Sequence, residues 1–271
     1  RDTPDDHNWA SYRETYDIDQ TRLTRETRYD DGRLEETTYV DGVRSSRMTT
    51  DRRDVFDWHT RAETFDANGI RVERTFTYDD GRISVSSYDA GALTSTHTTD
   101  TEDAYNWSEI TMAYLPGGVM HRTQTYDDGR VEETVFIDDA RQSRSVTDMA
   151  DVHPWLSRME RFDAAGDRVE RVITNDDGRV SQSFYEAGAQ TSALTTDTSD
   201  VFIWSTIGLS FEDGAVSQRS VTYDDGRVEE TTFTDGVRAT RSVTDVADAF
   251  DWDSSADNFD ATGDQMERVI L

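Results

Sequence analysis

The sequence predicts an all-β tandem-repeat fold, an antiparallel meander with about four strands per copy, its copies forming an extended or coiled array. Three observations predict it. Trp recurs at nearly constant intervals, an Asp-Asp-Gly-Arg turn recurs with the same step, and β-branched and aromatic residues alternate with polar ones between the turns. A five-bladed β-propeller is the alternative, since four strands and one Trp per copy also fit a propeller blade.

Each copy of about 48 residues contains one Trp and one turn glycine. Successive Trp residues are 48 or 49 positions apart, which divides a single array over 1–271 into copies 9–57, 58–106, 107–154, 155–203, 204–251 and a partial copy 252–271. We expect each Trp to be a core side chain that seals one copy against the next, and each glycine to occupy a left-handed turn position. These structural residues are Trp9, Trp58, Trp107, Trp155, Trp204 and Trp252, with Gly32, Gly81, Gly129, Gly178 and Gly226.

The first hairpin of the second copy shows the strand signals. A strand is expected over Trp58–Phe65, ending at the turn signal 66–69, Asp-Ala-Asn-Gly. A second strand is expected over Ile70–Tyr78, where apolar residues at 70, 72, 76 and 78 alternate with Arg, Glu and Thr. This alternation predicts one apolar face and one polar face.

The second hairpin follows from a different turn. Asp79-Asp80-Gly81 is expected to reverse the chain as a type I turn with its glycine in the left-handed bulge position, and a third strand then begins at Arg82. The Thr-rich stretch Leu93–Thr99 is the fourth strand, because β-branching favours extended backbone. An open array also accommodates a sixth copy of two strands, whereas a ring requires whole blades.

A longer period of about 97 residues lies over the single copies. The strand after the turn reads Leu34-Glu35-Glu36-Thr37 in the first copy and Ile83-Ser84-Val85-Ser86 in the second, and the later copies continue to alternate. The repeating unit is therefore a pair of copies, which suggests that alternate copies face different neighbours.

The connector between copies has the most constant spacing, Asp, then Asp three positions later, then Trp four positions after that. We favour a capping role, in which both carboxylates accept hydrogen bonds from free backbone N–H groups of a short helical turn. Calcium binding is the alternative, because paired carboxylates could converge on a cation with help from the Asp-rich turns. The candidate ligands are Asp51, Asp54, Asp100, Asp103, Asp148, Asp151, Asp197, Asp200, Asp245 and Asp248, with Asp2 and Asp5 as the first pair.

Composition excludes several classes of function. The net charge is −29 and every basic residue is Arg, so we expect neither nucleic-acid binding nor membrane insertion. There is no Cys, and the five His do not share one repeat position. Because no catalytic motif occurs either, we predict that the protein is not an enzyme and requires no cofactor. Calcium is the one ion whose binding the sequence allows.

The hairpin phrases Phe65–Gly69 and Tyr78–Arg82 resemble the Tyr-Asp repeats of bacterial Rhs proteins. The whole copy, with its connector at Thr244–Trp252, more specifically resembles tandem repeats in large secreted RTX-type proteins of marine alphaproteobacteria. That resemblance covers essentially the entire chain, and it implies type I export, an extracellular or cell-surface setting and a calcium-rich medium. The copy spacing differs from the Rhs consensus and the calcium-binding nonapeptide is missing, so neither encapsulation nor β-roll calcium binding is carried over.

Together these patterns predict an extracellular structural or adhesive scaffold, a stalk, spacer or fibre segment of a larger secreted or surface protein. The expected partners are further copies, by end-to-end self-association or within the parent protein, and surface glycans. Two alternatives remain, a carbohydrate-binding module that uses exposed Trp rings as stacking platforms and a calcium-stiffened linker. The sequence lacks both an initiator Met and a signal peptide, so we expect a mature or excised piece.

Overall fold

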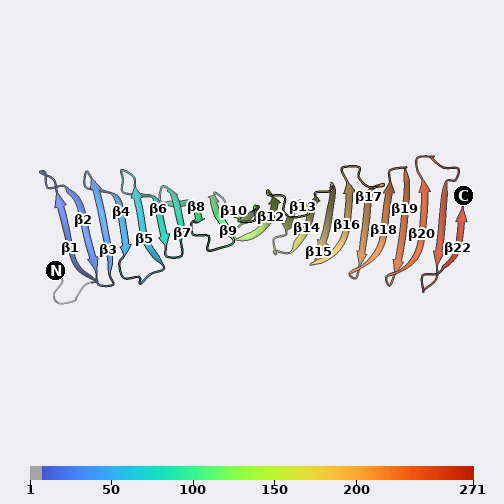
Figure 1. Ribbon diagram of the computed structural model, residues 1–271, viewed down its shortest axis with the longest axis horizontal. Coiled ribbons are helices and arrows are strands. Elements are labelled where there is room, and N and C mark those ends of the chain that lie inside the picture. The colour runs from blue at the N-terminus through green and yellow to red at the C-terminus, as the bar shows by residue number, and fades with distance from the viewer. Residues whose placement is uncertain (1–7) are drawn as a thin grey trace. The chain divides into compact units, whose positions relative to one another are not determined.

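The computed structural model describes residues 8–271 as 22 antiparallel strands, and this part of the chain contains no helix, so none could span a membrane (Figure 1). The strands are β1 Trp9–Tyr16, β2 Arg22–Tyr29, β3 Arg33–Val40, β4 Val43–Asp51, β5 Trp58–Phe65, β6 Arg71–Tyr78, β7 Arg82–Asp89, β8 Ala92–Asp100, β9 Trp107–Leu115, β10 Val119–Tyr126, β11 Arg130–Ile137, β12 Ala140–Asp148, β13 Trp155–Phe162, β14 Arg168–Asn175, β15 Arg179–Glu186, β16 Ala189–Asp197, β17 Trp204–Glu212, β18 Ala215–Tyr223, β19 Arg227–Thr234, β20 Val237–Asp245, β21 Ser254–Phe259 and β22 Gln265–Ile270.

The strands belong to two compact units, residues 1–133 with 137–139 and residues 134–136 with 140–271. In the first unit β1 to β10 pair in chain order, and in the second β12 to β22 do the same. Each unit is thus an open meander, and the predicted all-β repeat fold with four strands per copy is confirmed.

The five-bladed propeller is wrong, because hydrogen-bonded pairing continues from one copy into the next. The last strand of the first copy, β4, pairs with the first strand of the second, β5, and β16 pairs with β17 in the same way. Propeller blades are separate sheets that meet through side chains, so a blade boundary would interrupt these pairings.

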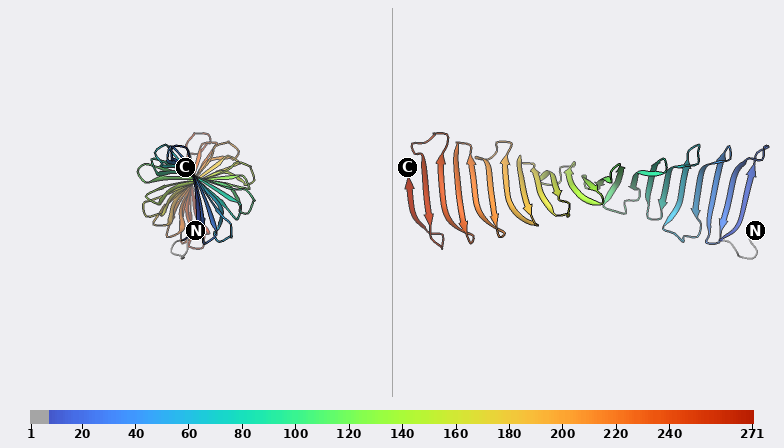
Figure 2. Two further views of the ribbon diagram at one scale, coloured as in Figure 1. Left: turned by 90° about the vertical axis from the view of Figure 1, so that its left-hand side faces the viewer. Right: turned by 180° about the vertical axis from the view of Figure 1, so that it is seen from behind.

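Within each unit the sheet is a single layer, because each strand contacts only the strands that precede and follow it. Figure 2 shows this layer from behind. The accessible surface of 16572 Å² exceeds the roughly 11,900 Å² that size scaling gives for a compact protein of 30.8 kDa. Both faces of the sheet are therefore accessible, and stability depends on contacts between neighbouring strands.

One face nevertheless carries most of the buried side chains, and we call it the packed face. It includes Thr49, which is 1% exposed, with Glu63 and Trp58, and in the second unit Val221 and Val243. Strand register places these residues together, for instance through the pairs Arg47–Glu63 and Thr49–Arg61 between β4 and β5. Long polar and aromatic side chains cover one another here, which replaces the apolar core that a second layer would provide.

The expected division into an apolar and a polar face is wrong for the start of β6. Ile70 and Val72 are about 40% exposed, whereas Phe76 and Tyr78 are half-buried on the packed face. A β-bulge between Thr64 and Phe65 shifts the register, so the alternation is not continuous along the strand.

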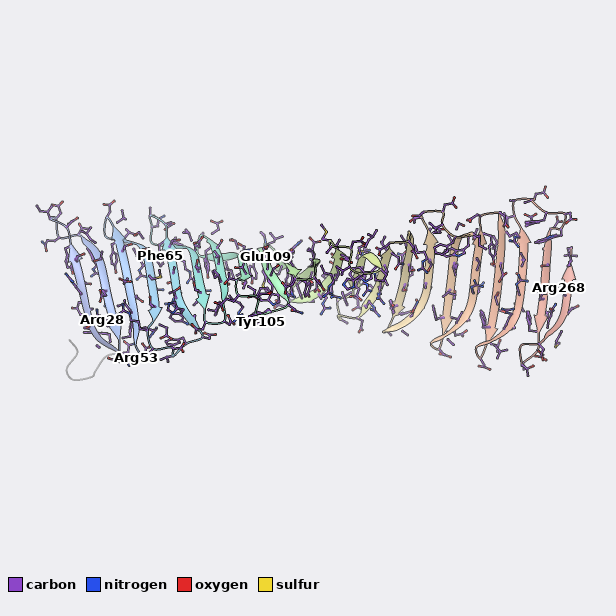
Figure 3. All side chains as sticks on the ribbon, in the orientation of Figure 1. Arg28, Arg53, Phe65, Tyr105, Glu109 and Arg268 are labelled. Atoms are coloured by element: carbon purple, nitrogen blue, oxygen red, sulfur yellow. The ribbon has the colours of Figure 1, made fainter. Side chains whose placement is uncertain are left out.

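Two long sides flank each unit. The connector side carries the Asp-Asp-Gly turns and the connectors between copies, and the hairpin side carries the other turns, such as 66–69 and 90–91. In Figure 3, Arg53 and Tyr105 lie along the connector side and Phe65 lies along the hairpin side.

Candidate functional site

The first Asp of each described connector binds the backbone of its own loop. In the first complete connector Asp51 accepts hydrogen bonds from the N–H groups of Arg53, Val55 and Phe56, at 3.0, 2.7 and 2.7 Å. The later connectors repeat contacts of this kind at Asp100, Asp148, Asp197 and Asp245. These backbone hydrogen bonds, the one from Phe56 first, hold the pKa of Asp51 below its ordinary value despite burial.

The second Asp of the connector has a different role from the one expected. Asp54, Asp103, Asp151, Asp200 and Asp248 all have positive φ, between 53° and 56°. The connectors are bends without a helical turn, so the expected N-cap geometry is wrong, although the first Asp does accept backbone N–H groups. Asp tolerates the left-handed conformation better than most residues, which explains its presence at this position.

The connector carboxylates lie near the first Asp of the following turn. Burial, and then the negative charges of connector carboxylates, raise the pKa of Asp79, Asp127, Asp176 and Asp224. Residues 8–271 nevertheless contain no cluster of three or more acidic or His side chains arranged to hold a metal ion. Of the calcium candidates, Asp2 and Asp5 lie outside the described residues.

The Arg of each Asp-Asp-Gly-Arg turn is fixed by the second Asp of the same turn. Asp80 accepts hydrogen bonds from both the backbone N–H and the Nε–H of Arg82, the latter at 2.9 Å. The guanidinium then lies between two aromatic rings, 4.6 Å from the centre of Tyr78 and 5.4 Å from that of Tyr105. Because Tyr105 belongs to the next connector, this Arg joins the turn to the connector that passes over it.

The turn glycines combine two requirements. All five have φ between +84° and +99°, a range that disfavours any side chain. The connector also passes very close to Gly32, Gly81, Gly178 and Gly226. A Cβ on Gly226, for example, would lie 2.2 Å from the Cβ of Ala247.

None of the six Trp side chains is exposed. Trp58 and Trp155 are buried at 9% and 4% exposure, and the other four are half-buried. Five of them stack on the aromatic residue two positions earlier, as Phe56 does on Trp58 with 5.2 Å between ring centres. One face of each of these indoles is therefore occupied by protein, which leaves poor stacking platforms for a sugar.

Alternating charges cross the packed face in a row that the sequence patterns above do not predict, and we call each such row a charge ladder. In the first unit Glu63, with a side chain only 2% exposed, accepts hydrogen bonds from Arg47 on β4 and from Arg71 on β6, the latter at 2.9 Å. Arg47 also lies 3.8 Å from Glu35 on β3.

The second unit repeats the ladder twice. Glu160 pairs with Arg144 and Arg168, and 97 residues later Asp257 pairs with Arg241 and Arg268. Burial alone would raise the pKa of Glu63 and Glu160, but hydrogen bonds and positive charge from their Arg partners lower it. The ladder occurs once per pair of copies. At the corresponding position of the junctions in between, Thr96 faces Met112 and Ala193 faces Leu209. The spacing of Arg47, Arg144 and Arg241 by 97 residues was the signal that could have revealed it.

Comparison with known proteins shows no family. No family model matches the chain, and no curated protein matches it. Among solved structures, a chain of the TcdB2-TccC3-Cdc42 crystal structure aligns with 97% of this chain at 13% identity and a TM-score of 0.24. A chain of the Photorhabdus luminescens Tc holotoxin pore aligns at 12% identity with a TM-score of 0.23. This chain spans 15% of the length of each, and similarity at this level carries no argument about its function.

Proposed function

We propose that this chain is an extracellular structural or adhesive scaffold, a spacer, stalk or fibre segment of a larger secreted or surface protein. One observation carries the proposal, namely that within each unit the described strands pack only against their neighbours in the sequence. A fold of this kind gains length with each added copy and needs no central core, which suits a spacer.

Three further features support this function. The Asp carboxylates of the connectors hold the loops, the Arg residues of the turns join turn to connector, and the charge ladders join strands. These chemically reactive residue types thus have structural contacts in the described part of the chain. The net charge of −29 favours a solvated surface, and screening in salty water with a Debye length of about 8–10 Å or less limits its self-repulsion.

Deletion of one pair of copies, residues 155–251, tests the scaffold function. Arg144 would then face Asp257 in place of its equivalent Glu160, so the new junction resembles the old one. Eight strands about 4.8 Å apart are removed, so we expect the second unit to shorten by about 38 Å. Small-angle scattering should detect a smaller largest dimension, while the β-sheet circular dichroism per residue is retained. Loss of folding, or an unchanged dimension, would contradict a spacer built from independent pairs.

Export and self-association are tested separately. Expression of the parent protein followed by cell fractionation should place it in the medium or on the cell surface. Sedimentation velocity over a wide concentration range should show end-to-end assembly as a steady increase in mass. A protein confined to the cell interior would refute the extracellular setting, and a constant monomer mass would refute self-association.

A further inference from the structure

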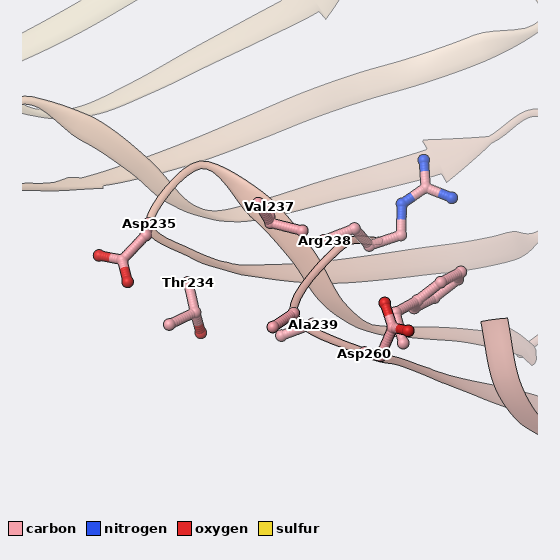
Figure 4. Close-up of a pocket in the computed structure, with 8 residues that line it drawn as sticks. Thr234, Asp235, Val237, Arg238, Ala239 and Asp260 are labelled. Carbon is pink, nitrogen blue, oxygen red and sulfur yellow. The ribbon is translucent and has the colours of Figure 1, made fainter. Parts of the chain in front are cut away.

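Two equivalent pockets lie on the hairpin side, one in each unit. The pocket of the second unit has a volume of about 270 Å³, and its lining includes Val237, Arg238, Phe259, Asp260 and Ala261 (Figure 4). The pocket of the first unit has a volume of about 240 Å³. Each residue that lines it lies 194 positions before the equivalent residue of the second pocket, a distance of two pairs of copies. The repeat thus produces the same hollow twice.

Strand irregularities next to the turns form this hollow. A bulge between Thr232 and Phe233 brings Phe233 opposite Arg238 in the β19–β20 hairpin, and a second bulge lies just before Phe259 in the β21–β22 hairpin. Bulges increase local twist and redirect side chains, so the two neighbouring tips separate and the hollow between them stays open.

The pocket combines a donor, an acceptor and an apolar wall. The Arg238 guanidinium lies 5.2 Å from the centre of the Phe259 ring, and Arg44 lies at the same distance from Phe65. Neither Arg forms an ion pair with a described carboxylate, so their N–H groups remain able to donate. Asp260 accepts two backbone hydrogen bonds through Oδ1 within its own turn, which leaves Oδ2 as an acceptor.

These groups favour a neutral ligand rich in hydroxyl groups. An Arg fork can donate to hydroxyl oxygens while a carboxylate accepts from hydroxyl hydrogens, and Val237 and Ala261 offer contact to C–H groups. Anionic ligands are disfavoured by the net charge of −29 and by the two carboxylates of the lining, Asp235 and Asp260, only one of which the Arg238 guanidinium offsets. The volume is below the roughly 300–1,000 Å³ of pockets that enclose drug-sized ligands, and it suits a single sugar residue.

We propose that the Arg–Phe pockets on the hairpin side bind residues of a neutral polysaccharide. The inference deepens the adhesive part of the proposed function by naming its ligand class, and it assigns sugar binding to the hairpin tips in place of the Trp rings. Arg141 and Phe162 form the same stack in the second unit, with 5.0 Å between guanidinium and ring centre. Weak sites repeated along one chain would bind one polymer with increased avidity.

Biolayer interferometry of the immobilised full chain tests the proposal with dextran, mannan and laminarin as neutral probes and alginate as the anionic probe. We expect binding to at least one neutral polymer and not to alginate. A triple variant, Arg44→Met, Arg141→Met and Arg238→Met, should weaken that binding by about tenfold or more, because it removes charged donors.

The matched control is the double variant Arg28→Met and Arg161→Met. Both control side chains are exposed, at 60% and 62%, and neither lines the pocket of either unit. Its binding should stay within about twofold of the original. The proposal is overturned if no neutral polymer binds, if alginate binds, if the triple variant binds normally, or if the control loses binding equally. None of these outcomes affects the scattering test of the scaffold itself.

Discussion

Removal of the carboxylate at the centre of a charge ladder should destabilise the sheet, and removal of its partner as well should restore much of the loss. The informative changes are Glu63→Met and Arg47→Thr, which reproduce the pair that the next copy uses at the same position, Met112 and Thr96. The double variant therefore replaces a charged junction with a neutral one that the same chain already contains.

The expected magnitudes follow from burial. Loss of one member of a fully buried ion pair costs about 3–5 kcal/mol, but the side chains of Arg47 and Arg71 are 24% and 33% exposed, so water can solvate them in part. We expect Glu63→Met to cost about 2–3 kcal/mol and Arg47→Thr about 1–2 kcal/mol. The double variant should cost about 1 kcal/mol, which against the sum of the two single variants gives a coupling energy of about 2–4 kcal/mol.

Urea denaturation followed by circular dichroism measures these free energies, and hydrogen exchange over β4–β6 localises them. The lowered pKa of Glu63 adds a second readout. A carboxyl with a lowered pKa contributes stability above its ordinary pKa, and the contribution is lost as the pH falls through the lowered value. The difference between the original chain and Glu63→Met should therefore shrink on acidification below about pH 4. Simple additivity of the two single variants at pH 7 would refute a coupled ladder.

Three further predictions concern the connector side. Gly226→Ala and Gly236→Ala both place a side chain at positive φ, which costs about 1–2 kcal/mol of unfolding free energy, but only the new Cβ at 226 would meet Ala247. In urea denaturation Gly226→Ala should therefore lose about 1–3 kcal/mol more unfolding free energy than Gly236→Ala, and equal losses would refute the close approach. Asp197→Ala should lower the melting temperature by about 2–4 °C, because the connector loop loses hydrogen bonds to this carboxylate. Asp200→Asn keeps a residue that tolerates positive φ and should leave the melting temperature unchanged, so equal shifts would contradict the different roles of the first and second Asp. The melting temperatures in calcium and in chelator should agree within about 1 °C, because the carboxylate of the first Asp in each connector already binds its own loop. A melting temperature several degrees higher in calcium would show instead that these carboxylates bind the ion.

The repeat and its strands could be predicted because each depends on local chemistry. Asp-Gly turns, β-branched residues and the regular Trp spacing recur along the chain, so an error at one copy is corrected by the others. The start of β6 could not be predicted, since a bulge depends on the partner strand and not on the strand's own alternation. The predicted helical turn of the connector failed for a related reason. Paired Asp residues can cap a helix or hold a left-handed bend, and the pattern alone does not distinguish these roles.

The hairpin-side pocket could not be found from spacing either. Arg238 and Phe259 lie on different hairpins, and each reaches the pocket next to a bulge. The charge ladder is different, because its residues repeat every 97 positions and each adjoining strand register follows from the turns on either side. Strand register combined with the longer period is sufficient to pair Arg47 with Glu63 from the amino-acid sequence alone.

The ladder also gives the longer period a physical reason. An array of identical copies could pair any strand with the equivalent strand of another copy, because every junction would be the same. Here a shift by one copy would place Arg47 opposite Met112 in place of Glu63, and a shift by two copies would place it opposite Glu160. A buried charge without its partner is costly, so alternation of charged and neutral junctions disfavours the one-copy shift. We infer that the pair of copies specifies register in a sheet that lacks an apolar core to do so, and the Arg47→Thr, Glu63→Met chain should therefore refold into its single register more slowly or less completely than the original.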